Sequence, residues 1–320
     1  MNRILLCPAL LIKRAGLWFV AARPQFFTAT IIPIALGAAI SWDHSGAFDW
    51  GLFWLTLIGG IFIHAGLDYS NDYYDYKTGN DVVNKTPTPF SGGSRFLREG
   101  ILRPKQVLLA SLICFAAGSA IGLYINYLLK TNAILIIGII GVFLAFFYTG
   151  GPVKIGYTRC AEAATGLGFG PLMVIGSYYV QARSILWQAL WASVPIGILI
   201  ALVQYINQFP DYEADKKARK NNTVVTLGKE KALRYYYIFL ILVYCLVILG
   251  VILDVFPKLA LITLLTAPLA VKAIRVAKAH FNQINELLPA NALTIAIHFL
   301  FGALFTAAYL LNRFITKGGS

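Results

Sequence analysis

The chain has 320 residues, of which 58% are hydrophobic and 13% charged, and its formal net charge is +13. Its mean hydropathy of +0.69 excludes an ordinary soluble protein and indicates a chain that crosses a membrane several times. The basic residues lie in short segments between apolar runs and form no single stripe with interleaved aromatic residues. We therefore expect no nucleic-acid partner.

The N-terminal segment contains an apolar run that Pro8 interrupts and that Lys13 and Arg14 close. No small-residue cleavage site follows, so the pattern does not predict a signal peptide. Trp18 and Phe19 lie beside the basic pair, which favours a helix in the membrane interface. We expect residues 1–22 to form this interfacial segment.

Apolar runs of membrane-spanning length follow along the rest of the chain. A bilayer core is crossed by roughly 20 apolar residues, so the sequence predicts an all-α polytopic membrane protein with nine transmembrane helices. The spans are expected near residues 26–42, 51–70, 107–128, 133–150, 163–181, 187–207, 235–253, 258–275 and 292–312. The whole chain, 1–320, is expected to form one domain that ends in a short tail, 313–320.

The basic residues predict the orientation of these spans. If the N-terminus is cytoplasmic, the inner segments hold 22 of the 27 Lys and Arg residues. Such a bias is typical of cytoplasmic loops. The odd number of spans then places the C-terminus outside.

Two acidic motifs lie where predicted spans end on the cytoplasmic side. The first follows the second span, and in it Asn71 and Asp75 are four residues apart. The second follows the sixth span, where Asp211 and Asp215 repeat that spacing. Side chains three or four residues apart share one face of a helix. Each motif therefore presents oxygen atoms one turn apart.

Two helices that present such oxygens predict a magnesium site. The expected ligands are Asn71, Asp72, Asp75, Asp211 and Asp215. Mg²⁺ takes carboxylate and other oxygen ligands and commonly binds substrate phosphates as well. Two unit charges 4 Å apart interact by about 4 kcal/mol at an effective dielectric of about 20, so the carboxylates alone would repel a diphosphate. A divalent cation reverses that repulsion.

Basic and amide side chains near the motifs are candidates for binding the diphosphate. Those suggested by position are Lys77, Arg95, Lys216, Lys217, Arg219, Lys220 and Asn207. Asp68 extends the face of the first motif one turn deeper. Plainer interpretations stay open, because Asp81 and Glu213 could be helix caps or surface charges. For His64, in an apolar run, polar packing is favoured over catalysis.

A cation-coupled transporter is the alternative from another class of protein, because intramembrane acids and weak internal repeats also mark transporters. The acids of this chain argue against it, since they cluster at one side of the membrane beside basic loops. Transporter sites typically lie near the bilayer midplane, between broken helices.

Motifs spread over nearly the whole chain carry a family resemblance. They are Ala22-Arg23-Pro24-Gln25-Phe26, Asn71-Asp72-x-x-Asp75 with Lys77, Gly79 and Asp81, Ser91-Gly92-Gly93, Tyr148-Thr149-Gly150-Gly151-Pro152 with Gly156-Tyr157, Gly170-Pro171, Gly176-x-Tyr178-Tyr179-Val180-Gln181, Asn207-x-x-x-Asp211-x-x-x-Asp215 and Thr223-Val224-Val225-Thr226-Leu227-Gly228. The set resembles the UbiA superfamily of intramembrane prenyltransferases. Within it, the chain is most similar to the 1,4-dihydroxy-2-naphthoate polyprenyltransferases of menaquinone synthesis.

The resemblance implies a nine-helix bundle with a cytoplasmic cap and a central cavity open to lipid. It implies that the five metal-binding residues above hold Mg²⁺ and the diphosphate of a polyprenyl diphosphate, and that an aromatic acceptor attacks the resulting allylic cation. Asp72, Asp75, Asp211 and Asp215 would then be catalytic. Tyr148 and Lys154 match positions that often guard the cation or contact phosphate. No required protein partner is implied.

Two departures from the family pattern concern the acceptor. The basic stretch after the second motif reads Ala218-Arg219-Lys220-Asn221-Asn222-Thr223, where the family usually has a glycine before its Lys or Arg. Asp68 occupies a position where an amide is more usual. Acceptors that resemble hydroxybenzoate or homogentisate, or a lipid acceptor, therefore stay open beside the naphthoate.

Overall fold

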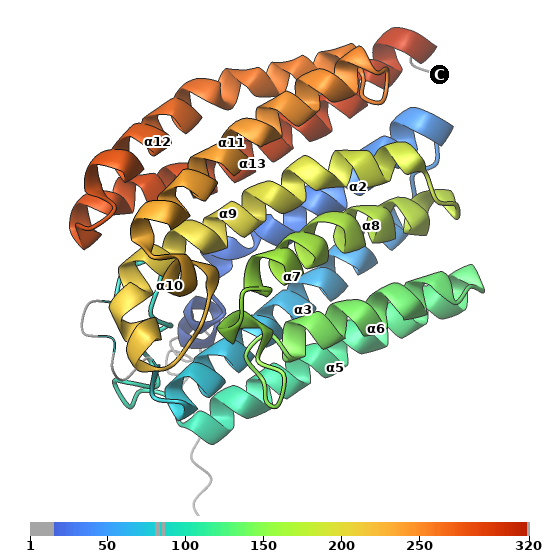
Figure 1. Ribbon diagram of the computed structural model, residues 1–320. Helices are drawn as coiled ribbons and strands as arrows, with labels where there is room; N and C mark the ends of the chain where they lie inside the picture. Colours follow the sequence, from blue (N-terminus) through green and yellow to red (C-terminus); the bar gives the residue numbers. More distant parts are fainter. Residues whose placement is uncertain (1–15, 81–83, 85–86, 319–320) are drawn as a thin grey trace, which may run out of the picture.

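The structure is a computed structural model that describes residues 16–80, 84 and 87–318, and this part of the chain contains helices and no strands (Figure 1). The elements are η1 Pro24–Phe26, α2 Thr28–Ser45, α3 Trp50–Lys77, α5 Pro104–Leu129, α6 Ala133–Phe146, η2 Ile155–Tyr157, α7 Ala161–Leu167, η3 Gly168–Leu172, α8 Met173–Ala182, α9 Trp187–Lys217, α10 Thr223–Leu227, α11 Lys229–Ile252, η4 Lys258–Thr266, α12 Ala267–His280 and α13 Ile284–Lys317.

The all-α membrane architecture is confirmed, and the protein is a multi-pass integral membrane protein. Among the described residues, seven helices are long and apolar enough to cross a membrane. They are Pro24–Ser45, Trp50–Lys77, Pro104–Leu129, Trp187–Lys217, Lys229–Ile252, Lys258–His280 and Ile284–Thr316.

The predicted count of nine spans is not confirmed, because the fourth and fifth predicted spans are not among these seven. The fourth corresponds to α6, which is apolar but has only 14 residues. The fifth corresponds to α7, η3 and α8, which follow one another without a gap. Its middle segment, η3, is a π-helix that contains Pro171. Proline removes a backbone donor and breaks the regular hydrogen bonding of a helix.

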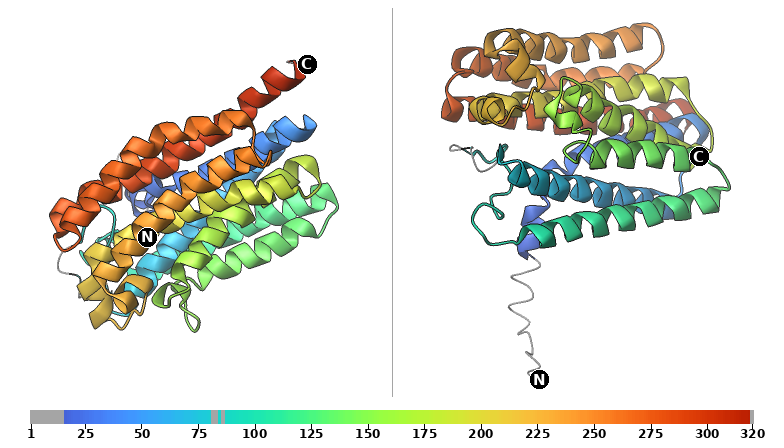
Figure 2. Two further views of the ribbon diagram at one scale, coloured as in Figure 1. Left: turned by 45° about the horizontal axis from the view of Figure 1, so that its top comes forward. Right: turned by 60° about the horizontal axis from the view of Figure 1, so that its bottom comes forward.

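The helices form three layers around α9 (Figures 1 and 2). On one side lie α11, α12 and α13, in the middle α9 and α2, and on the other side α3, α5 and α6, with α7 and α8 next to the middle layer. The side chains of Ile196, Leu199 and Ile206 on α9 are fully buried in the largest apolar cluster. In contrast, α5 exposes Leu112 and Ile113, as expected of a helix that faces lipid.

Glycines allow α9 to approach its neighbours closely. A Cβ atom on Gly170 would lie 2.7 Å from the Cα atom of Gly197, and a Cβ atom on Gly197 would lie 2.6 Å from the carbonyl oxygen of Gly166. Both distances are shorter than real Cβ contacts. The run from Gly166 to Gly170 therefore packs closely against α9.

The N-terminal end of the described chain packs onto α3, and the C-terminal helix is longer than the last predicted span. Residues 16–21 are helical, and the hydroxyl of Tyr69 donates a hydrogen bond of 2.7 Å to the carbonyl oxygen of Trp18. The first part of the predicted interfacial segment, residues 1–15, lies outside the described residues, as does Asp81. At the other end, α13 continues five residues beyond the predicted end of the last span.

Candidate active site

Helices α3 and α9 end on the same side of the bundle, near α10 and the segment that leads into α5 (Figure 1). A polar cavity of about 190 Å³ lies at these helix ends. Four carboxylates line it, those of Asp68, Asp75, Asp211 and Asp215. Amide side chains surround them: Asn71, Asn80, Asn84, Gln204, Asn207 and Gln208. The two helices are the ones on which the sequence placed the acidic motifs, and their continuation past the apolar runs brings the motifs together.

Lys220 joins the two motifs. Its Nζ atom lies 3.4 Å from Oδ2 of Asp75 and 3.8 Å from Oδ1 of Asp215. Burial lowers the pKa of the Lys220 amino group, but the carboxylates of Asp215 and Asp75 outweigh that effect and raise the pKa well above its ordinary value. The side chain is therefore a fixed positive charge between two carboxylates.

Tyr157 and Asn222 complete the hydrogen bonding around this lysine. The Tyr157 hydroxyl donates to Oδ1 of Asp75 at 2.8 Å, and its ring centroid lies 5.1 Å from Nζ of Lys220. Burial, together with the charge of Asp75, raises the pKa of Tyr157, so its hydroxyl stays a donor. Asn222 caps α10 and also donates to Oδ2 of Asp215 at 2.7 Å.

The remaining motif carboxylates have other partners. Asn84 donates from Nδ2 to Oδ1 of Asp211 at 2.9 Å. Asp72 forms an ion pair with Arg23 and accepts the backbone N–H of Ser94 at 3.2 Å. All five predicted metal ligands lie within the part of the chain that the structure describes. Four of them line the cavity, and Asp72 does not. The carboxylate of Asp72 thus links Arg23 and the segment around Ser94 to α3.

Of the residues predicted to bind diphosphate, the structure brings Lys220 and Asn207 to the cavity. Six others do not line it: Lys77, Arg95, Lys154, Lys216, Lys217 and Arg219. Three of these lysines lie over tyrosine rings, Lys77 over Tyr73, Lys154 over Tyr157 and Lys216 over Tyr212. Arg95 donates to the carbonyl oxygen of Pro87 at 3.0 Å.

Sequence reasoning missed several residues that line the cavity or hold its carboxylates. Arg23 was given no role at the site beyond its place in a family motif, and Asn80, Asn84 and Asn222 were not singled out. An asparagine beside a predicted carboxylate motif is the one signal that points to Asn80. No sequence spacing indicates that Asn84 or Asn222 reaches the motif on α9.

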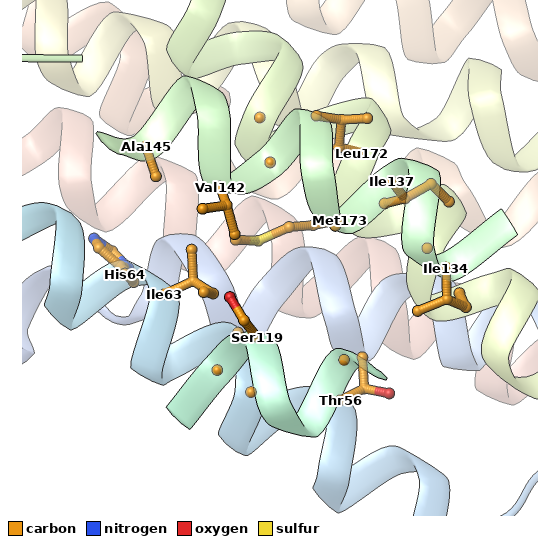
Figure 3. A pocket seen from close by; sticks show the side chains of 18 of the residues that line it. Thr56, Ile63, His64, Ser119, Ile134, Ile137, Val142, Ala145, Leu172 and Met173 are labelled. Atoms are coloured by element: carbon orange, nitrogen blue, oxygen red, sulfur yellow. The ribbon is translucent and has the colours of Figure 1, made fainter. Parts of the chain in front are cut away.

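An apolar cavity of about 640 Å³ adjoins the polar one. Side chains of α3, α5, α6 and α8 line it, and Figure 3 shows Met173 extending from α8 across it toward Val142. The two cavities share the lining residues His64, Leu67, Tyr148, Thr165 and Phe169. A molecule with a charged head and a long apolar tail therefore fits the two cavities together.

The apolar cavity runs along α6. His64 and Ala145 lie at one end and Ile134 at the other (Figure 3). Ala145 and Ile134 are eleven residues apart, which corresponds to about 16 Å of helix. Ile139 and Phe143 of α6 line the cavity and are exposed.

Tyr148 lies between the polar and the apolar cavity. Its hydroxyl accepts a hydrogen bond from Nε2 of Gln204 on α9. The ring therefore has a fixed position, and it borders both the carboxylates and the apolar tail region.

The donor set fits a hard divalent cation. Among the described residues, no group of three or more His, Cys, Asp and Glu side chains is close enough to hold a metal ion by itself. The cavity nevertheless offers oxygen donors from two facing helices, and Mg²⁺ characteristically combines one or two carboxylates with substrate phosphates and water. The residues therefore suit Mg²⁺ that arrives with a phosphorylated substrate better than a cation held by protein alone.

Comparisons with known proteins agree with this geometry. The model of the UbiA prenyltransferase family matches residues 30–288. The chain is 27% identical over 293 residues to the 2-carboxy-1,4-naphthoquinone phytyltransferase of Synechocystis sp., with 92% of each chain covered. It is 26% identical over 292 residues to the 1,4-dihydroxy-2-naphthoate octaprenyltransferase of Bacillus subtilis, with 91% of each covered.

Solved structures show the same fold. A UbiA homolog from Aeropyrum pernix K1 has a TM-score of 0.65 at 17% identity, covering 88% of this chain and 96% of its own. A UbiA homolog from Archaeoglobus fulgidus bound to GPP and Mg²⁺ has a TM-score of 0.62 at 17% identity, covering 91% of this chain and 99% of its own. The chain belongs to the UbiA prenyltransferase family and is an integral membrane prenyltransferase.

Proposed function

We propose that this prenyltransferase catalyses the Mg²⁺-dependent transfer of a polyprenyl group from polyprenyl diphosphate to 1,4-dihydroxy-2-naphthoate, which forms demethylmenaquinol, the reduced form of demethylmenaquinone. The observation that carries the proposal is the junction of a carboxylate-lined cavity with an apolar cavity of about 640 Å³. The names of the Synechocystis and Bacillus subtilis relatives support a naphthalene-type acceptor.

The polar cavity would bind the diphosphate. Asn71, Asp75, Asp211 and Asp215 are the proposed Mg²⁺ ligands because they line it, whereas Asp72 would reach it only by leaving Arg23. Bound Mg²⁺ would neutralise the diphosphate and make it a better leaving group. The relative from Archaeoglobus fulgidus binds GPP and Mg²⁺, which supports this pairing of ligand and metal.

Lys220 and Asn207 would contact the leaving group. The ammonium of Lys220 lies between the two motifs, so it stabilises negative charge that develops on the diphosphate oxygens. Asn207 accepts a hydrogen bond from Asn291 at its Oδ1, which leaves its Nδ2 to donate toward a substrate oxygen. Lys77, Arg95, Lys154, Lys216 and Arg219 would attract the anionic substrates to this end of the bundle.

The apolar cavity would hold the prenyl chain, and Tyr148 would guard the reacting carbon. The bond between the prenyl carbon and the diphosphate oxygen breaks with its electron pair on oxygen. An aromatic ring such as that of Tyr148 stabilises an adjacent cation through its face. The acceptor ring carbon then forms the new carbon–carbon bond, and the carboxyl group leaves as carbon dioxide. Exclusion of water by the apolar lining prevents hydrolysis of the cation.

The same proposal covers topology and domain organisation. We propose nine spans in one domain, 1–320, with the N-terminus cytoplasmic and the C-terminus outside. Helix α6 and the continuous run from α7 to α8 would be the two spans beyond the seven that length and composition identify. The positive-inside bias of the loops supports this orientation. The transporter alternative lacks support, since the chain belongs to a family of prenyltransferases.

The test of the acceptor is a panel of aromatic substrates. Purified protein, Mg²⁺ and a polyprenyl diphosphate are incubated with 1,4-dihydroxy-2-naphthoate, 4-hydroxybenzoate or homogentisate, and products are identified by mass spectrometry. We expect a prenylated and decarboxylated product from the naphthoate at the highest kcat/KM. A higher kcat/KM with either of the other rings would contradict the proposed acceptor.

A further inference from the structure

His64 and Asp68 lie on α3 at the junction of the two cavities, and prenyl diphosphate chemistry leaves both without a role. His64 lines both cavities and Asp68 lines the polar one. Both are buried, with Asp68 only 6% exposed. Buried polar side chains inside a membrane protein are costly and commonly mark functional sites.

The two side chains face each other across a gap that a hydrogen bond does not close. Nε2 of His64 lies 3.8 Å from Oδ2 of Asp68. That exceeds the hydrogen-bond range of about 2.7–3.2 Å, but one oxygen at about 2.8 Å from each atom would bridge them. The other ring nitrogen, Nδ1, is engaged at 2.8 Å by the hydroxyl of Thr30 on α2, so the imidazole has a fixed orientation.

Oδ2 of Asp68 is a buried oxygen with no hydrogen-bond partner among the described residues. Leaving such a group unsatisfied costs about 1–3 kcal/mol or more, so it is expected to have a partner in the working enzyme. The oxygen that bridges the two side chains would supply that partner.

Aromatic side chains pack around His64. The ring centroid of Phe169 lies 4.8 Å from that of His64 in an edge-to-face arrangement, and the centroid of Phe27 lies 5.4 Å from it. Phe169 also lines both cavities. A planar aromatic molecule packs favourably against such rings. The site thus combines apolar walls with a polar end that takes one oxygen.

We propose that His64 and Asp68 bind a hydroxyl group of the aromatic acceptor. The inference rests on the proposed function and deepens it by assigning the acceptor subsite. The acceptor hydroxyl would accept a hydrogen bond from Nε2 of His64 and donate one to Oδ2 of Asp68. Donation to a carboxylate increases the electron density of the ring, which favours attack on the prenyl carbon. The subsite also places the ring beside Tyr148, where the two cavities meet.

The first test measures acceptor binding without turnover. Asp68→Ala and the nearly isosteric Asp68→Asn are compared with wild type for binding of 1,4-dihydroxy-2-naphthoate, anaerobically and without Mg²⁺ or prenyl diphosphate, by quenching of tryptophan fluorescence. We expect Kd to rise about tenfold or more in Asp68→Ala, as for the loss of one hydrogen bond to a charged group. Asp68→Asn keeps the shape and one oxygen acceptor of the side chain but loses its charge, so its Kd should rise less than that of Asp68→Ala. An unchanged Kd in Asp68→Ala would overturn the proposal.

A matched control is His298→Gln. His298 is also a buried histidine of a membrane-spanning helix, 1% exposed, with no hydrogen-bond partner for Nε2 among the described residues, but it lines neither cavity. We expect His64→Gln to weaken acceptor binding and His298→Gln to leave it unchanged. Equal effects of the two substitutions would show that the His64 site is structural and would overturn the proposal.

The second test removes the hydroxyl from the ligand. With 1,4-dimethoxy-2-naphthoate, wild type should lose about tenfold in affinity, whereas Asp68→Ala should lose little, because the partner is already absent. Equal losses in both proteins would overturn the proposal. So would Asp68 variants that change the Mg²⁺ requirement or the KM for prenyl diphosphate and leave acceptor binding intact, since Asp68 would then serve the diphosphate. Failure of wild type to prenylate any aromatic acceptor would refute the proposed function instead.

Discussion

Replacing Lys220 by methionine removes the positive charge that lies between the two acidic motifs. The side chain is 15% exposed and makes ion pairs with Asp75 at 3.4 Å and with Asp215 at 3.8 Å. Methionine keeps most of the volume and the unbranched shape of the lysine stem. The variant therefore tests the charge with little change in packing.

The magnitude follows from the two distances. At an effective dielectric of about 20, these ion pairs have gross Coulomb energies of about 4.9 and about 4.4 kcal/mol. Desolvation of the lysine offsets part of that attraction, and removing one partner of a buried ion pair typically costs about 3–5 kcal/mol. We expect Lys220→Met to lower the free energy of unfolding of the metal-free protein by about 3 kcal/mol.

The assay is thermal unfolding in detergent, followed by tryptophan fluorescence, with and without Mg²⁺. The matched control is Lys216→Met, because Lys216 is exposed and lies over the ring of Tyr212 without reaching the cavity. We expect a marked loss of stability only in Lys220→Met, with a larger recovery on adding Mg²⁺ than in wild type. Equal unfolding temperatures of the two variants would refute the reasoning about the carboxylate pair.

Three further predictions concern the apolar cavity, the packing of α2 against α8, and the N-cap of α10. Gly141→Phe fills open space in the apolar cavity, so the ratio of kcat/KM for short over long prenyl diphosphates should rise. Gly37→Ala places a Cβ atom 2.3 Å from a carbonyl oxygen of α8 and should destabilise the protein by about 1–3 kcal/mol, whereas Gly122→Ala, with no atom within 4 Å, should not. Thermal unfolding compares these two variants. Asn222→Ala removes the N-cap of α10 and a hydrogen bond to Asp215. The KM for prenyl diphosphate should therefore rise, and limited proteolysis should cleave the chain at α10 sooner than in wild type.

Hydropathy predicted the long spans because a bilayer selects for about 20 apolar residues. It could not predict where helices end outside the bilayer. The second predicted span stops at residue 70 and the sixth at residue 207, yet α3 continues to Lys77 and α9 to Lys217. Those extensions carry the acidic motifs. The π-helix between α7 and α8 was also missed, because the apolar run around Pro171 has no polar residue to mark it.

Helical spacing predicted that Asp75, Asp211 and Asp215 lie close together, but it could not identify their partners. Asp75, Asp211 and Asp215 share one cavity because each lies on the inward face of its helix end. Arg23 and Asn84 reach the motifs from distant segments, at sequence separations of 49 and 127 residues. Such contacts depend on how whole helices and loops pack, which no local pattern encodes. Asp72 illustrates the limit, since its position in the motif predicted a metal ligand and its carboxylate pairs with Arg23.

The most direct test of the central claim measures diphosphate release by wild type, Asp75→Asn and Asp211→Asn. Each protein receives Mg²⁺, a polyprenyl diphosphate and 1,4-dihydroxy-2-naphthoate, and Glu213→Gln, which alters an exposed acid beside the second motif, is the control. If the ends of α3 and α9 form the site of prenyl transfer, each Asn variant should lose about a hundredfold or more in rate, and Glu213→Gln should match wild type. Rates of the two Asn variants within a few-fold of wild type would contradict the account.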